Sequence, residues 1–209
     1  MKKVENRQII TDRNVECVIP GNQTVCIPPG TAGYTKTINM IRLLLTAFLV
    51  FVNLSLCAQT PEDNLRKLGI ALPEVTEPVG SYVHCVRAGN LLFLAGKGPQ
   101  KDGQYVKGKL GRELSTEEGF AAARLTGIIQ IAVLRKELGS LSKVKRIVKV
   151  NGFVNSDSNF YDHPKVINGY SDLMIQVFGE KGKHARTSLG VAALPFNMAV
   201  EVEMIVEVE

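Results

Sequence analysis

The residues best suited to chemistry lie near the carboxyl end of the 209-residue chain. Arg186 belongs to one run of residues that alternate in polarity, and Glu201 and Glu203 belong to a second run beyond Pro195. Alternation with a period of two is typical of strands that bury one face. We therefore expect a hairpin whose polar face carries a guanidinium on one strand and carboxylates on its neighbour. An acidic and a basic group held on rigid strands have the character of a site for a small charged molecule.

Strands and helices elsewhere in the chain must position these groups. Ser115 and Glu118 have the spacing of a helix capping box, and Gly139 provides the matching stop signal. We expect helices at 115–138 and 165–178, and strands at 81–86, 91–95, 104–106, 144–154, 186–191 and 200–207. This order predicts an α+β fold with one mixed sheet and two helices packed on one face. Because the other face stays uncovered, we expect the chain to self-associate.

Residues 40–58 have the features of a secretory signal peptide. A single Arg42 precedes an apolar run that is too short to span a bilayer comfortably, and small residues follow it. Since a signal peptide begins a protein, we expect Met40 to be the true start and residues 1–39 to be a spurious or disordered extension. This predicts an exported, periplasmic protein with no stable membrane span after signal removal. The alternatives are a genuine soluble extension that ends in a membrane anchor, and a lipid anchor on Cys57.

The rest of the chain divides into a tether or edge helix at 59–77 and a folded domain at 78–209. The formal net charge is +5, but residues 1–58 hold six Lys or Arg and three Asp or Glu, which leaves 19 basic and 17 acidic residues in the remainder. This near-neutral balance gives little support for a nucleic-acid partner. Cys85 is the single cysteine after residue 58, so we expect neither an intrachain disulfide nor a zinc cluster. No paired metal-ligand spacing occurs, and no metal site is expected.

Two stretches of the domain resemble the reactive-intermediate deaminase family, which is also called the YjgF or L-PSP endoribonuclease-like family. They are GSYVHCVRAGNLLFLAGKGP, which begins at Gly80, and HARTSLGVAALPFNMAVEVEMI, which begins at His184. The resemblance covers residues 79–209 and implies a chorismate-mutase-like fold and a homotrimer with clefts between subunits. It also implies deamination of small 2-imino or enamino acids to keto acids and ammonia, without a cofactor. The partners it implies are a small carboxylate substrate and further copies of the chain.

The resemblance also assigns residues to the site. Arg186 matches the family's carboxylate-binding arginine, whose planar fork can hold a carboxylate through two charge-assisted bonds. Glu201 matches the glutamate that orients the attacking water, and these two are the expected catalytic residues. Tyr82 matches a tyrosine of the cleft, and Ser188 stands where many members have a cysteine. Asn168 is carried over as the asparagine of the second helix, although its spacing to Arg186 differs from the family pattern.

Some positions and functions leave alternatives open. Lys97 replaces the family's usual glutamine after the second strand, and it is either a substrate-binding residue or a solvated loop charge. Glu203 shares its strand face with Glu201 and could replace it, and Arg186 could be a structural ion-pair partner of either glutamate. The alternative functions are a non-catalytic trimer that binds a small carboxylate, and an endoribonuclease. The near-neutral charge and the lack of a histidine pair disfavour the ribonuclease.

Overall fold

The computed structural model describes residues 59–78 and 80–209. The extension and the signal peptide predicted for residues 1–58 lie outside this part. The helices are α2 (Pro61–Lys67), α3 (Thr116–Leu138) and α4 (His163–Phe178), with the short 3-10 helices η1 (Leu141–Lys143), η2 (Gly179–Gly182) and η3 (Pro195–Asn197). The strands are β1 (Cys85–Ala88), β2 (Leu91–Lys97), β3 (Gln100–Lys101), β4 (Gln104–Tyr105), β5 (Val144–Asn155), β6 (Ala185–Val191) and β7 (Val200–Val208). No helix in the described part is long and apolar enough to cross a membrane.

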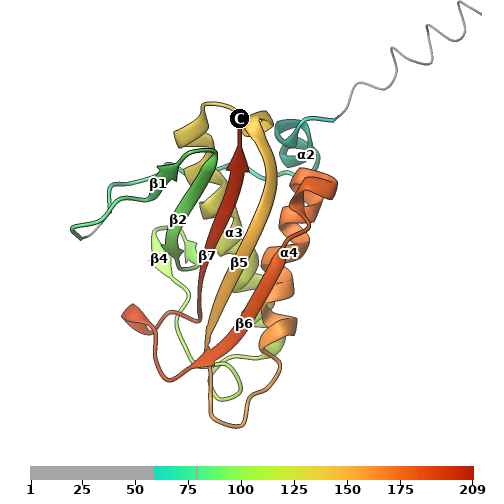
Figure 1. Ribbon diagram of the computed structural model, residues 1–209. Coiled ribbons are helices and arrows are strands. Elements are labelled where there is room, and N and C mark those ends of the chain that lie inside the picture. The colour runs from blue at the N-terminus through green and yellow to red at the C-terminus, as the bar shows by residue number, and fades with distance from the viewer. Residues whose placement is uncertain (1–58, 79) are drawn as a thin grey trace, which may run out of the picture. The chain divides into compact units, whose positions relative to one another are not determined.

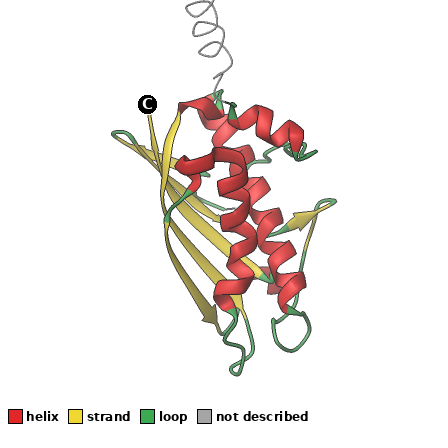
Figure 2. Ribbon diagram, turned by 90° about the vertical axis from the view of Figure 1, so that its right-hand side faces the viewer, coloured by secondary structure: helices red, strands yellow, loops and turns green. Residues whose placement is uncertain are grey.

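Five of these strands form one mixed sheet in the order β1-β2-β7-β5-β6 (Figure 1). Neighbouring strands run antiparallel except for β5 and β6, which are parallel. The short β3 and β4 pair separately. Figure 2 shows that the helices lie together on one face of the sheet. The predicted α+β fold, with a single mixed sheet covered by helices on one side, is therefore confirmed.

The strand β7 determines which side chains of the sheet face the helices. Every second side chain of β7 is buried, and the intervening ones are only partly buried. The buried set consists of Val200, Val202, Met204, Val206 and Val208. In the neighbouring β5, Val150 lies opposite Met204 and is also fully buried. The apolar core therefore lies between the sheet and the two long helices.

Both long helices begin and end at strong local signals. The Ser115 hydroxyl accepts the backbone N–H of Glu118, and the Glu118 carboxylate accepts the backbone N–H of Ser115, so the predicted capping box of α3 is confirmed. Gly139 ends α3 in the left-handed conformation, with φ of 73°. The helix α4 begins at His163 rather than at 165, because the proline that follows is favourable in a first helical turn.

The predicted carboxyl-terminal hairpin is wrong. The strands β6 and β7 do not pair with each other, because β5 lies between them and is hydrogen-bonded to both. An alternating pattern identifies the two faces of a strand, but it does not identify the strand's neighbour. The first strand also differs from the prediction, because pairing begins at Cys85 and residues 81–84 form a loop.

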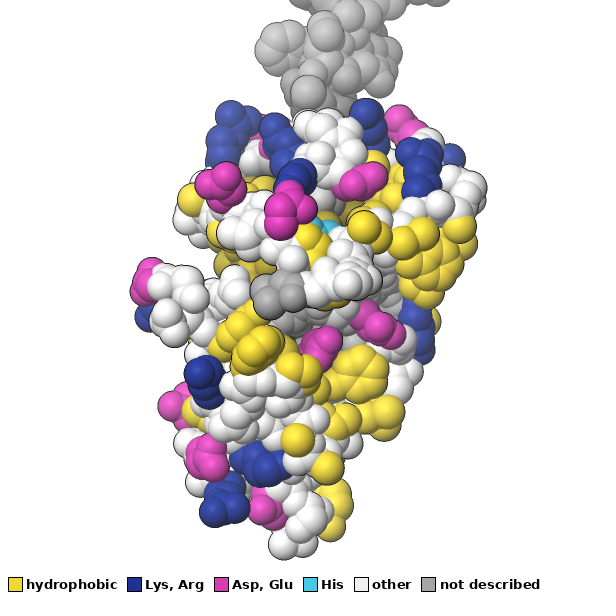
Figure 3. Space-filling view, turned by 90° about the vertical axis from the view of Figure 1, so that its left-hand side faces the viewer, with side chains coloured by type: hydrophobic (Ala, Val, Ile, Leu, Met, Phe, Trp, Pro, Cys, Tyr) yellow, Lys and Arg dark blue, Asp and Glu magenta, His cyan; other side chains and the backbone are white. Residues whose placement is uncertain are grey.

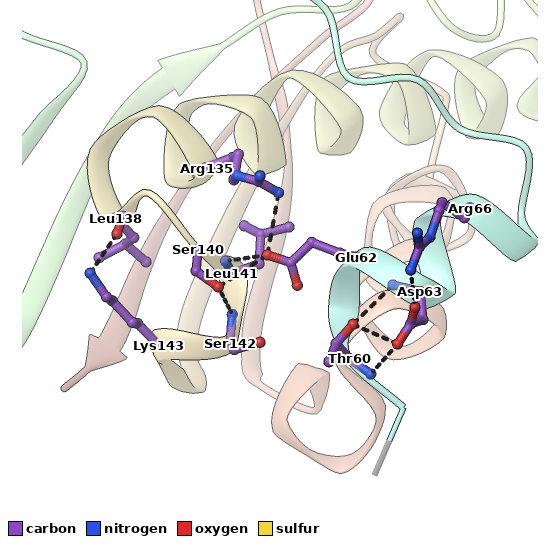
Figure 4. Close-up of polar contacts among 10 residues, drawn as sticks. All are labelled: Thr60, Glu62, Asp63, Arg66, Arg135, Leu138, Ser140, Leu141, Ser142 and Lys143. Carbon is purple, nitrogen blue, oxygen red and sulfur yellow. Dashed lines mark hydrogen bonds and ion pairs between the residues drawn. The ribbon is translucent and has the colours of Figure 1, made fainter. Parts of the chain in front are cut away.

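The helix α2 lies in the segment interpreted as a tether or edge helix, and Glu62 fastens it to the end of α3 (Figure 4). One carboxylate oxygen of Glu62 accepts hydrogen bonds from the backbone N–H of Leu141 at 2.8 Å, from Ser140 Oγ at 3.2 Å and from Arg135 Nη1 at 3.3 Å. Leu65 of α2 is buried in the same core as the sheet and the long helices. The segment therefore packs against the domain as an additional helix.

The crossing of α3 and α4 depends on a close backbone contact at Gly169. A Cβ atom at this position would overlap the carbonyl oxygen of Phe120, which is backbone and cannot rotate away. At Gly127 on α3, the nearest atoms to an added Cβ are the side-chain ends of Leu173 and Met174, at 2.9 and 3.1 Å. Flexible side chains can move aside, so a methyl group can be accommodated at Gly127. At Gly169 it can be accommodated only if the two helices move apart.

We predict that Gly169→Ala lowers the free energy of unfolding by at least about 2 kcal/mol, because the helices must separate to admit the methyl group. This loss should occur although alanine in a helix interior is usually about 1 kcal/mol more favourable than glycine. Gly127→Ala is the matched control and should cost clearly less. Urea denaturation followed by circular dichroism measures both, and equal losses would contradict a backbone-limited crossing.

Candidate functional site

Arg186 extends from the edge strand β6 towards α4. Its Nη1 donates hydrogen bonds to Asn168 Oδ1 at 2.9 Å and to Ser171 Oγ at 3.0 Å, and its Nη2 donates to the Pro164 carbonyl oxygen at 3.3 Å. Among the described residues, Nε–H and the other Nη2–H make no hydrogen bond. A carboxylate can accept such a pair of donors at once. The side chain is therefore held in place and keeps donors for an anionic ligand.

The hydroxyl group of Ser171 is itself oriented by His184. Nδ1 of His184 lies 2.7 Å from the carbonyl oxygen of Gly182, so this nitrogen carries the hydrogen. Nε2 can then accept the Ser171 hydroxyl at 3.0 Å, which leaves the hydroxyl oxygen to accept from Arg186. Burial lowers the pKa of His184 and the charge of Arg186 lowers it further, while the hydrogen bond to Gly182 acts in the opposite direction. The family resemblance does not point to Ser171, but its i, i+3 spacing from Asn168 places both on one face of α4.

Arg186 and Glu201 lie on opposite faces of the sheet, so the prediction of a shared face is wrong. Arg186 is opposite Val150, whose side chain is fully buried under the helices. Glu201 is opposite Phe153, an odd-numbered residue of the same strand that faces the uncovered side. Because β6 and β7 both pair with β5, a residue opposite Val150 faces the helices and a residue opposite Phe153 faces away from them. The side chains of Arg186 and Glu201 therefore point to opposite sides of the sheet. Neither an ion pair nor a shared site can form between them within one chain.

Glu201 and Glu203 share the uncovered face, but their surroundings differ. Glu203 accepts a hydrogen bond from Asn151 Nδ2 at 2.9 Å, whereas no hydrogen bond reaches the Glu201 carboxylate from the described residues. Glu201 lies against the backbone of Gly96, where a Cβ atom would collide with Oε1. Burial raises the pKa of Glu201, the nearby Glu203 raises it further, and Lys97 acts in the opposite direction. A half-buried carboxylate of this kind is suited to proton transfer, so Glu201 is the better candidate base.

The other candidate residues divide between the two edges of the sheet. Asn168 contacts Arg186, and Ser188 follows Arg186 on the same face of β6. The Ser188 hydroxyl is buried and has no hydrogen-bond partner in the described part of the chain. At the other edge, Tyr82 lies in the loop before β1, and Lys97 Nζ is 5.7 Å from the centre of its ring. Within residues 59–78 and 80–209, no His, Cys, Asp or Glu cluster could hold a metal ion.

The uncovered face of the sheet exposes apolar side chains. Val86, Phe93 and Leu189 are exposed on three different strands, with fractional exposures of 55%, 41% and 51%. Figure 3, which views the molecule from the edge that carries β1, shows hydrophobic side chains interspersed with acidic and basic ones. Apolar side chains that spread across a sheet face in this way are typical of an interaction surface.

Comparisons with known proteins identify the family. Residues 62–208 match the family model described as "YjgF/chorismate_mutase-like, putative endoribonuclease". The chain belongs to this YjgF family. The protein named TCP17 from Trypanosoma cruzi is 46% identical over 146 residues, which cover 69% of this chain and 91% of that protein. A protein named 2-iminobutanoate/2-iminopropanoate deaminase, from Dermatophagoides farinae, is 30% identical over 142 residues, which cover 67% and 95% of the two chains.

A solved structure with a similar sequence agrees with the fold. The crystal structure of Atu1372 from Agrobacterium tumefaciens, described as a protein of unknown function, is 40% identical in sequence and superimposes with a TM-score of 0.67. The match covers 71% of this chain and 92% of that one. The family resemblance of the sequence and the fold that it implies are both confirmed.

The raised pKa of Glu201 predicts a pH-dependent effect on the stability of this YjgF-family protein. Because the folded state binds this proton more tightly than the unfolded state, the contribution is favourable at low pH and is lost as the pH rises through the folded pKa. Glu201→Gln should therefore raise the free energy of unfolding relative to wild type more at about pH 7 than at about pH 4. Urea denaturation at both pH values measures this, with Glu207→Gln as a control for removing one carboxylate from the same face of β7. If Glu201→Gln raises the free energy of unfolding equally at both pH values, the raised pKa of Glu201 is contradicted.

Proposed function

We propose that this YjgF-family protein is a cofactor-independent hydrolytic deaminase of small 2-imino and enamino acids. The observation that carries the proposal is the environment of Arg186, a half-buried guanidinium held by Asn168, Ser171 and the Pro164 carbonyl group. Within the described part of the chain it has no carboxylate partner at ion-pair distance. Burial lowers the pKa of Arg186 although the nearby Asp172 acts in the opposite direction, so the charged form is partly destabilised and a bound carboxylate would stabilise it. The similarity to a protein named 2-iminobutanoate/2-iminopropanoate deaminase supports an imino acid as the ligand.

In the proposed reaction, Arg186 holds the substrate carboxylate through its Nε–H and remaining Nη2–H donors. This contact fixes the adjacent imine carbon relative to the protein. Glu201 accepts a proton from a water molecule as the water oxygen attacks that carbon, and the imine nitrogen takes up a proton. The protonated Glu201 then gives its proton to the amine nitrogen of the tetrahedral carbinolamine. Ammonia leaves as the C–N bond breaks and the hydroxyl proton passes to Glu201, which releases it to solvent. The products are a 2-keto acid and ammonia, and an enamine enters the same route after a proton is added to its β-carbon.

We propose further that the site forms between subunits of a homotrimer. Arg186 faces the helices and Glu201 faces the uncovered side, so two copies are needed to present both groups to one substrate. Association through the uncovered face would also bury the exposed apolar side chains of Val86, Phe93 and Leu189. The neighbour would then bring its Glu201 and Tyr82 to the Arg186 of the first subunit.

Removing the guanidinium should abolish most of the activity. We predict that Arg186→Ala lowers kcat/KM for keto-acid release from freshly generated 2-aminoacrylate by at least about 100-fold. Arg124→Ala is the matched control, because Arg124 bonds to Gln176 on the outside of the helix layer and should keep wild-type activity. Equal rates for Arg186→Ala and wild type would reject the deaminase, and tight substrate binding without ammonia release in wild type would indicate a binding protein.

Mixing two inactive variants tests whether the site lies between subunits. If each site takes Arg186 from one copy and Glu201 from the next, every mixed ring of Arg186→Ala and Glu201→Gln contains one intact site. Random co-assembly of equal amounts into trimers should restore about one quarter of the wild-type sites. Co-expression followed by the keto-acid assay measures the recovery. A mixture as inactive as the separate variants would contradict the shared site.

A further inference from the structure

Lys97 has a histidine, rather than an acid, as its polar partner. Its Nζ lies 2.6 Å from Nδ1 of His84, and Nε2 of His84 lies 2.6 Å from the carbonyl oxygen of Thr76. A carbonyl oxygen only accepts hydrogen bonds, so Nε2 carries the hydrogen and Nδ1 of the neutral ring accepts one from Lys97. An ammonium group and a doubly protonated imidazole could not make this contact. The geometry therefore limits the pair to one positive charge.

The amine opens into a hollow of about 310 Å³. The hollow lies between residues 73–78, the loop before β1, the β3–β4 hairpin and α3, and its walls include Tyr82, Tyr105, Ile129 and Val133. Burial beside these apolar walls lowers the pKa of Lys97, while the charge of Glu201 acts in the opposite direction. No carboxylate in the described part of the chain lies within ion-pair distance of Nζ. A larger fraction of the Lys97 amine is therefore unprotonated than of an ordinary surface lysine.

The charges at the rim of the hollow restrict what it can accept. Three acidic residues, Glu74, Glu77 and Asp102, line it together with Lys97. They disfavour an anionic ligand such as a 2-keto acid, whereas the aromatic and aliphatic walls favour an uncharged organic molecule. The size of the hollow is at the lower end for small-molecule sites, which favours a small molecule.

We propose that Lys97 is a nucleophilic amine that captures a small uncharged aldehyde as an imine in this hollow, with His84 as its base. The three groups have the roles of nucleophile, base and orienting acceptor, which are Lys97, His84 and the Thr76 carbonyl oxygen. The Nζ lone pair attacks the carbonyl carbon, the carbonyl oxygen takes up a proton, and Nδ1 of His84 receives a proton from Nζ. The carbinolamine then loses its hydroxyl group as water and leaves a C=N bond to Lys97. One aldehyde is consumed and one water is released, with no change in oxidation state.

Imine formation at Lys97 does not use the groups that carry the proposed deaminase chemistry, although Tyr82 lines this hollow and is also proposed to reach the Arg186 of a neighbouring copy. Lys97 lies opposite Val202 on the helix-covered face of the sheet, whereas Glu201 lies on the uncovered face. Neither Arg186 nor an incoming carboxylate takes part in imine formation. The aldehyde proposal and the deaminase proposal can therefore fail independently.

Reductive trapping tests the proposal on the full chain. The protein is incubated at neutral pH with propanal and cyanoborohydride, which reduces an imine to a stable secondary amine, and the labelled lysines are located by peptide mass mapping. Lys97 should be labelled at least about 10-fold faster than Lys101, an exposed lysine of β3 beside the hollow. Labelling of Lys97 at the rate of Lys101 would overturn the proposal.

Two further comparisons separate the roles of the base and of the ligand charge. His84→Ala should slow the labelling of Lys97 and leave that of Lys101 unchanged, and an unchanged rate at Lys97 would remove His84 from the mechanism. The ratio of Lys97 to Lys101 labelling should be smaller with pyruvate than with propanal, because this ratio removes the lower intrinsic reactivity of a ketone. A larger Lys97 to Lys101 ratio with pyruvate would show that the hollow selects keto acids and would overturn the assignment of an uncharged ligand.

Discussion

The alternation of side chains along β7 is the constraint on which the rest of the structure depends. One set of its side chains is fully apolar and buried, so the helices can cover only that face of the sheet. The intervening set includes Glu201, Glu203 and Glu207, which makes the other face too polar for a second layer of helices. Because β7 pairs with both β2 and β5, the register of each pair determines which side chains of β2 and β5 also face the helices.

The same constraint leaves two parts of a single chain without partners: hydrogen-bond donors of Arg186 and the uncovered face of the sheet. The guanidinium of Arg186 is held at the edge of the helix-covered face, with donors that have no partner among the described residues. The uncovered face combines a half-buried carboxylate at Glu201 with exposed apolar side chains such as Phe93. Both features are unfavourable for an isolated subunit, and both would be relieved by a neighbouring copy and a bound acid. The proposed function and the proposed assembly therefore rest on one geometric fact.

Local signals in the sequence predicted the elements, but they could not predict the order of the strands. The capping box at Ser115 and the glycine at 139 act within one turn of helix, so the ends of α3 could be predicted from residues close in the sequence. The pairing of β6 with β5 instead of β7 depends on contacts between residues far apart in the chain. A hairpin is the shortest connection between two adjacent strands, and nothing local in the run around Pro195 excludes it. For the same reason the family motif identified Arg186 and Glu201 as candidates but could not place them on opposite faces.

A bulge in β2 places the side chain of Lys97 on the opposite face of the sheet from the carboxylate of Glu201. The register between β2 and β7 shifts between Leu94 and Lys97, and the buried Gln130 of α3 donates hydrogen bonds to the carbonyl oxygens of Ala95 and Val202 across this shift. The extra residue makes room for the Glu201 side chain over Gly96 and directs the next side chain, Lys97, to the helix-covered face. In a regular strand the amine and the carboxylate could lie on the same face and neutralise each other. With the bulge, the two groups lie on opposite faces of the sheet and their charges still act on each other, but burial keeps the pKa of Glu201 raised and the amine takes a histidine as its hydrogen-bond partner.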